Sequence, residues 1–153
     1  MAKTRNAQQD TRLPSPQRTK LLSELAQDPK NLKRFLNRYG DEAASLIKRH
    51  GYPPKYWKGR PSYKEGQVET VWKNKAHGKD YFINENSEMI TWNKDIPRKG
   101  QWDMGHLEDQ KYSDIYDFFI RGDISEEKFL EWYKEAGNYE PQTIPFNRGH
   151  KGE

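Results

Sequence analysis

The chain has 153 residues, of which 33% are charged and only 32% are hydrophobic, so we expect one domain, or one small domain with an appendage, around a modest core. The absence of cysteine excludes disulfides and every cysteine-based zinc site. No apolar run approaches the length of a membrane span or a signal-peptide core, which argues against membrane insertion.

The net charge of +4 is distributed unevenly along the chain. Residues 1–60 hold 14 Lys and Arg against 5 Asp and Glu (+9), whereas residues 61–153 hold 13 against 18 (−5). A basic arm joined to an acidic half favours phosphate contacts by the arm, because cations bind the nucleic-acid backbone whatever its sequence. A solvated basic tail is the plainer interpretation, above all for residues 1–12.

The N-terminal part predicts a disordered tail followed by a helical basic region. Residues 1–13 are polar and basic without periodicity, which predicts disorder, and residues 14–59 hold the helical signals. Ser15-Pro16 and Asp28-Pro29 each combine an N-cap with a first-turn proline, and a third helix opens at Asp41 and stops at Gly51. Cations on the outer faces of these helices are predicted to contact nucleic acid: Lys33, Arg38, Lys48 and Arg49.

A small antiparallel β-hairpin or meander is predicted after a Gly- and Pro-rich connector at residues 51–66. Partly alternating runs at 67–72, 80–83 and 89–92 indicate strands, with turn residues at His77-Gly78 and at 84–87. Two helices follow, over residues 113–121 and from Ser125 to about Ala136, and Phe129, Leu130, Trp132 and Tyr133 would form the buried face of the second. The predicted fold class is therefore α+β.

Asp103-x-Gly105-His106 is the first cluster that could carry chemistry. A histidine titrates near neutrality and can take a proton from a positioned water molecule. Gly105 would let backbone or substrate approach closely, and Asp103 could orient the imidazole or meet a metal ion. The alternative is an ordinary turn, because Asp and Gly are common turn residues.

Asn147-x-x-His150-x-x-Glu153, at the end of the chain, is the second cluster. On a helix these three positions drift only modestly around one face, although Gly149 and Gly152 make a turn or loop equally compatible. An amide oxygen, an imidazole and a carboxylate suit Mg²⁺ or Mn²⁺, with Zn²⁺ and Ni²⁺ as alternatives. The intervening cations, Arg148 and Lys151, could hold phosphates. A frayed polar tail is the competing interpretation.

The order and spacing of these segments resemble one protein family. The run from Gly100 to His106, two helices, Asn138-Tyr139 and the terminal residues 147–153 are similar to the GH-E family. This family is a branch of the HNH/endonuclease VII nuclease superfamily and occurs as C-terminal toxin domains of bacterial polymorphic toxins. The resemblance extends upstream through Arg60-Pro61-Ser62-Tyr63, residues 68–72 and Ile90-Thr91-Trp92, so it covers residues 60–153.

The resemblance implies a ββα-metal core and a metal-dependent endonuclease that hydrolyses DNA phosphodiester bonds. The family name points to Gly105, His106 and Glu153, with Gly149-His150 as a second match. We expect His106 to act as the base and Arg148 to stabilise transition-state charge, and we expect the metal to be held by His150 and Glu153, with Asn147 and Asp103. The resemblance leaves open which histidine is base and which is ligand. Glu153 would then be buried beside His106 in one split site.

A toxin domain implies further partners. These are a cognate immunity protein and a carrier toxin polypeptide or secretion machinery, with residues 1–59 as the end of that carrier. Delivery into the cytoplasm of a target cell during interbacterial competition would follow. Two alternatives stay open on the sequence alone, namely an RNase toxin on the same scaffold and a non-enzymatic nucleic-acid-binding module that uses the basic helices at 15–50.

Overall fold

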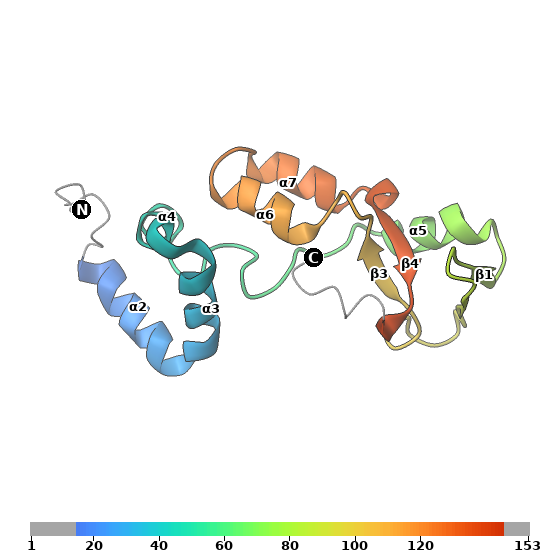
Figure 1. Ribbon diagram of the computed structural model, residues 1–153, viewed down its shortest axis with the longest axis horizontal. Coiled ribbons are helices and arrows are strands. Elements are labelled where there is room, and N and C mark those ends of the chain that lie inside the picture. Colours follow the sequence, from blue (N-terminus) through green and yellow to red (C-terminus); the bar gives the residue numbers. More distant parts are fainter. Residues whose placement is uncertain (1–14, 146–153) are drawn as a thin grey trace. The chain divides into compact units, whose positions relative to one another are not determined.

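The computed structural model describes residues 15–145, and the chain divides into two compact units, one up to Arg60 and one from Pro61 on (Figure 1). The first unit is helical, and the second combines helices with two small antiparallel sheets of two strands each. The predicted α+β class is therefore confirmed, whereas the predicted disordered tail at 1–13 lies outside the described residues. No helix within residues 15–145 has the length and apolar character that crossing a membrane requires.

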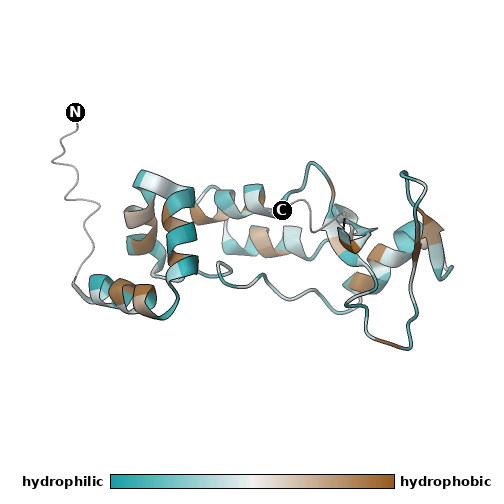
Figure 2. Ribbon diagram, turned by 60° about the horizontal axis from the view of Figure 1, so that its bottom comes forward, coloured by the Kyte–Doolittle hydropathy of each residue, from teal (hydrophilic) through white to brown (hydrophobic). Residues whose placement is uncertain are grey.

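Three helices form the first unit: α2 (Ser15–Gln27), α3 (Pro29–Tyr39) and α4 (Ala43–His50), with a 3-10 turn at Gly40–Glu42. Phe35 of α3 is fully buried and packs edge-on against Trp57 at a centroid distance of 5.0 Å and against Tyr52 at 5.6 Å. Hydrophobic residues are also interleaved along α2 (Figure 2). However, α2 buries none of its residues, so its apolar side chains do not enter the core.

Lys58 ties the connector after α4 to the junction between α2 and α3. Its Nζ lies 3.0 Å from Glu24 Oε1 and 3.4 Å from Asp28 Oδ2. The hydrogen bond that Asn31 Nδ2 donates to Asp28 and the neighbouring ammonium of Lys58 lower the pKa of Asp28. The hydrogen bond to Glu24 raises the pKa of Lys58. Asp28 thus marks the start of α3 as predicted, but through a side-chain bond to Asn31 rather than by capping a backbone N–H.

The second unit begins with a helix where the sequence predicted a strand. Residues 67–72 belong to α5 (Gln67–Ala76), so the prediction of a strand there is wrong. The β-branched residues of this run favour a strand locally. In the fold, Gln67, Val71, Trp72 and Ala76 share one buried helical face, and packing overrides the local preference.

The remaining predicted strands pair as a short hairpin. β1 (Tyr81–Ile83) and β2 (Met89–Thr91) are antiparallel, with Phe82 opposite Ile90. The turn between them is closed by Asn84, whose side-chain oxygen accepts from the backbone N–H groups of Asn86 and Glu88 at 2.9 Å each. The meander is therefore reduced to two strands, because its first member is helical.

The second strand pair is formed by two segments that are separated in the sequence by two helices. β3 (Asp103–His106) and β4 (Tyr139–Gln142) are antiparallel, and α6 (Tyr112–Ile120) and α7 (Glu126–Tyr133) lie between them in the sequence. Both predicted helices are confirmed, and Ser125 caps α7 by accepting from Lys128 N at 3.1 Å. The predicted order of a hairpin followed by helices is observed, because α6 and α7 follow the β1–β2 hairpin, but the pairing of β3 with β4 on either side of the two helices was not predicted.

Tryptophan residues dominate the core of the second unit. Trp72, Trp92 and Trp102 contact one another at centroid distances of 5.3 to 5.5 Å, and Val71 and Met104 complete the buried cluster. Their exposed fractions do not exceed 7%. These tryptophans therefore pack in the core of the second unit rather than on its surface. Because Trp102 directly precedes β3, this core positions the strand that carries Gly105 and His106.

We predict that Trp72→Ala lowers the free energy of unfolding of the second unit by about 3–5 kcal/mol, because it opens a cavity in the centre of the tryptophan cluster. Urea denaturation followed by tryptophan fluorescence and circular dichroism measures the change. Lys73→Ala, at the exposed neighbouring position of α5, is the control and should leave the midpoint almost unchanged. Equal midpoints for the two variants would contradict the assignment of Trp72 to the core.

Candidate active site

The β3–β4 pair presents different residues on its two faces. Register places Gly105 opposite Glu140 and His106 opposite Tyr139. Side chains alternate along a strand, so Met104 and His106 lie on one face and Asp103 and Gly105 on the other. Since Met104 and Tyr139 belong to the buried cluster, the face with His106 is the inner face.

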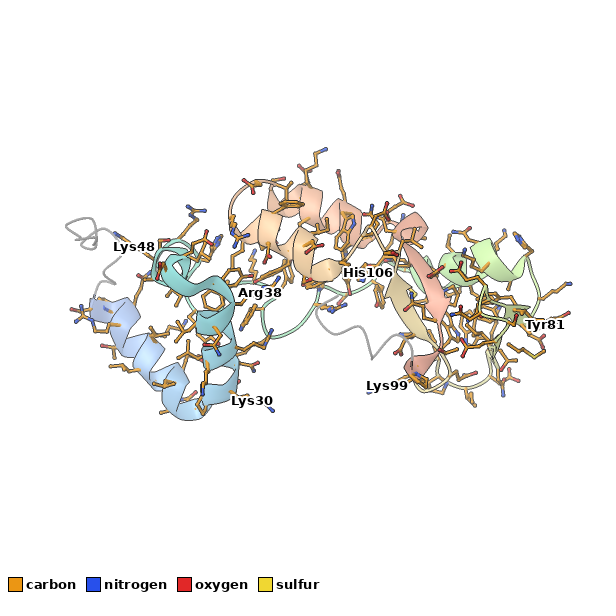
Figure 3. All side chains as sticks on the ribbon, in the orientation of Figure 1. Lys30, Arg38, Lys48, Tyr81, Lys99 and His106 are labelled. Atoms are coloured by element: carbon orange, nitrogen blue, oxygen red, sulfur yellow. The ribbon has the colours of Figure 1, made fainter. Side chains whose placement is uncertain are left out.

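His106 lies in a box of aromatic rings. Its imidazole is 3% exposed, stacks on Trp132 at a centroid distance of 5.1 Å and an interplanar angle of 7°, and lies 4.4 Å from the ring of Tyr139. Tyr112 and Tyr133 close the box at 6.1 and 6.2 Å. Figure 3 places His106 where β3 meets the α6–α7 pair. The imidazole is thus held in a defined orientation and shielded from bulk solvent.

Hydrogen bonds fix the box around His106. Trp132 Nε1 donates to Gln110 Oε1 at 2.6 Å, and the Tyr139 hydroxyl donates to the Tyr133 carbonyl at 2.6 Å. The same residue of α7 is tied to α5, because Gln67 Nε2 also donates to the Tyr133 carbonyl at 2.9 Å. These bonds join α5, α7 and β4, so the position of His106 depends on the packing of the whole unit.

The outer face of the strand pair is rich in oxygen atoms. Asp103 lies opposite Gln142, and the side chain of Gln142 lies over Gly105. Gln142 Nε2 donates to Glu140 Oε2 at 3.2 Å, and Lys75 Nζ lies 3.8 Å from the other oxygen of Glu140. A pocket of about 290 Å³ borders this face and is lined by Lys75, Asn84, Glu140, Gln142 and their neighbours.

Strand alternation separates two predicted site residues. Asp103 and His106 project from opposite faces of β3. The carboxylate of Asp103 and the imidazole of His106 therefore point in opposite directions from the strand. The metal role of Asp103 and the base role of His106 stay predictions. Gly105 is buried between them, and the group that approaches it closely is the side chain of Gln142 rather than backbone.

The whole of the second predicted cluster lies beyond the part of the chain that the structure describes. This holds for Asn147, Arg148, His150, Lys151 and Glu153, and therefore for the predicted burial of Glu153 beside His106. Within residues 15–145 no group of three or more His, Cys, Asp or Glu side chains could hold a metal ion. The described strands contribute one predicted ligand, Asp103, and a buried amide oxygen on Gln142 that has no hydrogen-bond partner among the described residues. These donors suit a hard cation but do not form a complete site by themselves.

The cations predicted to contact nucleic acid belong to the other unit. Lys33 and Arg38 are exposed on α3, and Lys48 and Arg49 are exposed in the last turn of α4. Arg34 is held over the ring of Trp57, with 3.9 Å between its Cζ and the ring centroid. Their role in binding stays a prediction.

The comparison with protein families decides what the second unit is. Residues 77–153 match the model of the GH-E family, described as an HNH/ENDO VII superfamily nuclease with conserved GHE residues. The chain belongs to the GH-E family. No solved structure is significantly similar to it. The match begins at His77, so it includes β1 to β4, α6 and α7 but not residues 60–72, where part of the sequence resemblance lies.

Membership of the GH-E family gives the second unit its activity class. A nuclease of the HNH/ENDO VII superfamily hydrolyses phosphodiester bonds in nucleic acid, and the superfamily implies a ββα-metal core and the use of a divalent metal. Both Gly105 and His106 lie within the matched residues, on a paired strand. The GH-E match therefore makes the β3–β4 pair the candidate active site.

Sequence reasoning missed the surroundings of this site. Gln142 and Glu140 were not singled out, and β3 and β4 were not predicted as strands, because each is short and contains Gly or Pro. Two residues of the aromatic box, Trp132 and Tyr133, were predicted from the sequence to lie on the buried face of α7. Nothing local to residues 139–142 indicates that Tyr139 would contact His106.

We predict that the box shields His106 from chemical modification. Diethyl pyrocarbonate should react with the exposed His77 well before it reacts with His106, as followed by peptide mass spectrometry. Trp132→Ala removes the stacked ring and should accelerate modification of His106 several-fold while leaving the rate at His77 unchanged. If His106 of the unaltered protein reacts as fast as His77, the enclosed position of the imidazole is wrong.

Proposed function

We propose that this GH-E protein is a metal-dependent endonuclease that hydrolyses DNA phosphodiester bonds and acts as the toxic C-terminal domain of a bacterial polymorphic toxin. The observation that carries the proposal is the family match over residues 77–153, which includes Gly105-His106 on β3. DNA follows from the resemblance to an endonuclease superfamily. An RNase toxin on the same scaffold is the alternative.

His106 is proposed as the general base. A general base needs one water molecule within hydrogen-bond reach, and an imidazole shielded by Trp132 and Tyr139 would meet an ordered molecule rather than bulk solvent. A divalent cation, when bound, stabilises negative charge on the scissile phosphate and on the leaving oxygen. His150, Glu153, Asn147 and Asp103 are proposed to hold it, with Mg²⁺ or Mn²⁺ favoured. Arg148 is proposed to offset charge in the transition state.

We predict that the protein converts supercoiled plasmid to cut forms in the presence of Mg²⁺ or Mn²⁺ and that EDTA stops the reaction. His106→Ala should slow cleavage by about 10²–10⁴-fold, the usual contribution of a general base. His77→Ala, at an exposed turn position, should cut at the unaltered rate and serves as the control. Circular dichroism of both variants separates loss of the base from loss of the fold.

Three outcomes would contradict parts of this proposal. Intact plasmid together with degraded tRNA would replace DNA by RNA as the substrate. An unaltered rate for His106→Ala would remove this residue from the role of base. Unchanged cleavage after deletion of Lys151-Gly152-Glu153 would remove Glu153 from the site.

The basic face of α3 is proposed to hold the phosphate backbone. Lys30, Lys33, Arg34 and Arg38 recur at helical spacing on the side opposite the buried Leu32, Phe35 and Tyr39, and α3 contains no carboxylate. An open groove on this face is lined by these cations together with Asn31 and Asn37. Figure 3 marks Lys30 and Arg38 on α3 and Lys48 on α4. Closely spaced cations on a rigid helix suit a polyanion, whatever its base sequence.

We predict that Lys33→Gln/Arg38→Gln weakens DNA binding mainly at low salt. The slope of log K against log salt concentration should become shallower by about 1.8, because each lost phosphate contact removes about 0.9. Fluorescence anisotropy with a labelled duplex at several salt concentrations measures it. Lys111→Gln/Lys128→Gln removes the same charge near the acidic helices α6 and α7 and should leave the slope unchanged. Equal effects of the two double variants would reduce the role of α3 to net charge.

A nuclease toxin needs protection of the cell that makes it, so we propose a cognate immunity protein and delivery by a carrier polypeptide or secretion machinery into the cytoplasm of a target cell. The family resemblance to polymorphic toxin domains supports this part of the proposal. Expression in a bacterium should be toxic, and the His106→Ala variant should be tolerated.

A further inference from the structure

Gly105 is distinguished by what occupies the space above its Cα rather than by its backbone conformation. Its φ is not among the positive values that favour glycine, in contrast to Gly66 or Gly100. A Cβ built at position 105 would instead overlap the carboxamide carbon and both terminal atoms of Gln142. The obstacle is therefore one side chain that reaches diagonally across the strand pair, since Gln142 lies opposite Asp103.

The Gln142 side chain that occupies this space is buried, but only one of its two polar atoms makes a hydrogen bond. Its exposed fraction is 7%, and its Nε2 donates to Glu140 at 3.2 Å. Its Oε1 is fully buried and accepts no hydrogen bond from any residue between 15 and 145. Burial of an acceptor without a donor is unfavourable, so an atom of this kind marks a place where a ligand or an ordered water molecule belongs.

The surroundings of Gln142 indicate the kind of group it would receive. It shares the outer face of the strand pair with Asp103 and Glu140, whose carboxylates are acceptors. It also lines the pocket that holds Lys75 and Asn84. A water molecule, free or in the hydration shell of a cation, can donate to an amide oxygen and to a carboxylate at once, which suits this set of acceptors.

We propose that Gln142 is a positioning residue of the nuclease site and that its Oε1 accepts a hydrogen bond from a water molecule held at the outer face of β3 and β4. The absence of a side chain at Gly105 leaves the space that the Gln142 carboxamide occupies. The proposal rests on the proposed function of this strand pair. It assigns the two residues as a matched pair: glycine at 105 makes room, and glutamine at 142 fills that room with an acceptor. A side chain that only filled space would not need to be polar.

The steric half of the proposal is tested by a double-mutant cycle in urea. Gly105→Ala should lower the unfolding midpoint, because the new methyl group meets the carboxamide of Gln142. Gly105→Ala/Gln142→Ala should recover the midpoint of Gln142→Ala alone, since the obstacle is removed. If the double variant unfolds no later than Gly105→Ala, the pairing of these two residues is overturned. This readout does not depend on nuclease activity.

The acceptor half is tested by Gln142→Met, which keeps the length of the side chain and removes the oxygen. The rate constant kcat for plasmid cleavage should fall by about 10–100-fold, the usual effect of losing such a supporting contact, with little change in KM. The matched control is Gln101→Met, because both amide atoms of Gln101 are bonded within its own loop, to Asn93 N and to the Pro97 carbonyl.

The two glutamine variants should behave in opposite ways. Gln101→Met should lower the urea midpoint more than Gln142→Met does, because it removes bonds that are made in the folded loop, and its kcat in the folded state should stay close to that of the unaltered protein. An unaltered kcat for Gln142→Met overturns the positioning role. If the unaltered protein cuts neither DNA nor RNA, the proposed function fails instead, and the double-mutant cycle still decides whether Gly105 and Gln142 are matched.

Discussion

The pairing of β3 with β4 is the interaction on which the site of this GH-E protein depends. Four residue pairs join segments that are separated in the sequence by two helices, α6 and α7. The inner face of this pair is sealed by the tryptophan cluster, because Met104 and Tyr139 are members of it. The register then determines that His106 faces Tyr139 and that Gly105 faces Glu140. A slip of one residue would reverse both faces.

Burial gives the two faces different chemistry. On the inner face, aromatic rings limit the motion of His106 and exclude bulk solvent. On the outer face, Gln142 and Glu140 add oxygen acceptors beside Asp103, and a pocket lined in part by Gln142 and Glu140 borders this face. A strand pair that separates a shielded imidazole from an oxygen-rich surface can hold a base and the acceptors for water or a cation at a fixed separation, which suits the hydrolysis that family membership implies.

The first unit contributes charge rather than a shielded cleft. Its core is a small aromatic cluster around Phe35, and α3 carries cations on its outer face and no carboxylate within its own sequence. Such a surface is proposed to bind polyanions without reading their sequence, whereas the strand pair of the second unit is proposed to supply the chemistry. The unequal charge of residues 1–60 and 61–153 therefore coincides with two compact units that differ in composition and in proposed task.

The sequence by itself determined the α+β class, the helices of the first unit, α6, α7, the β1–β2 hairpin and the family, because caps, turns and the order of short motifs are local signals. Tertiary structure alone decided that residues 67–72 are helical, since the burial of Val71 and Trp72 outweighs their strand propensity. It also decided that Asp103 and His106 lie on opposite faces and that Gln142 covers Gly105. These relations arise from pairing between residues more than thirty positions apart, and no local pattern at either strand encodes the register.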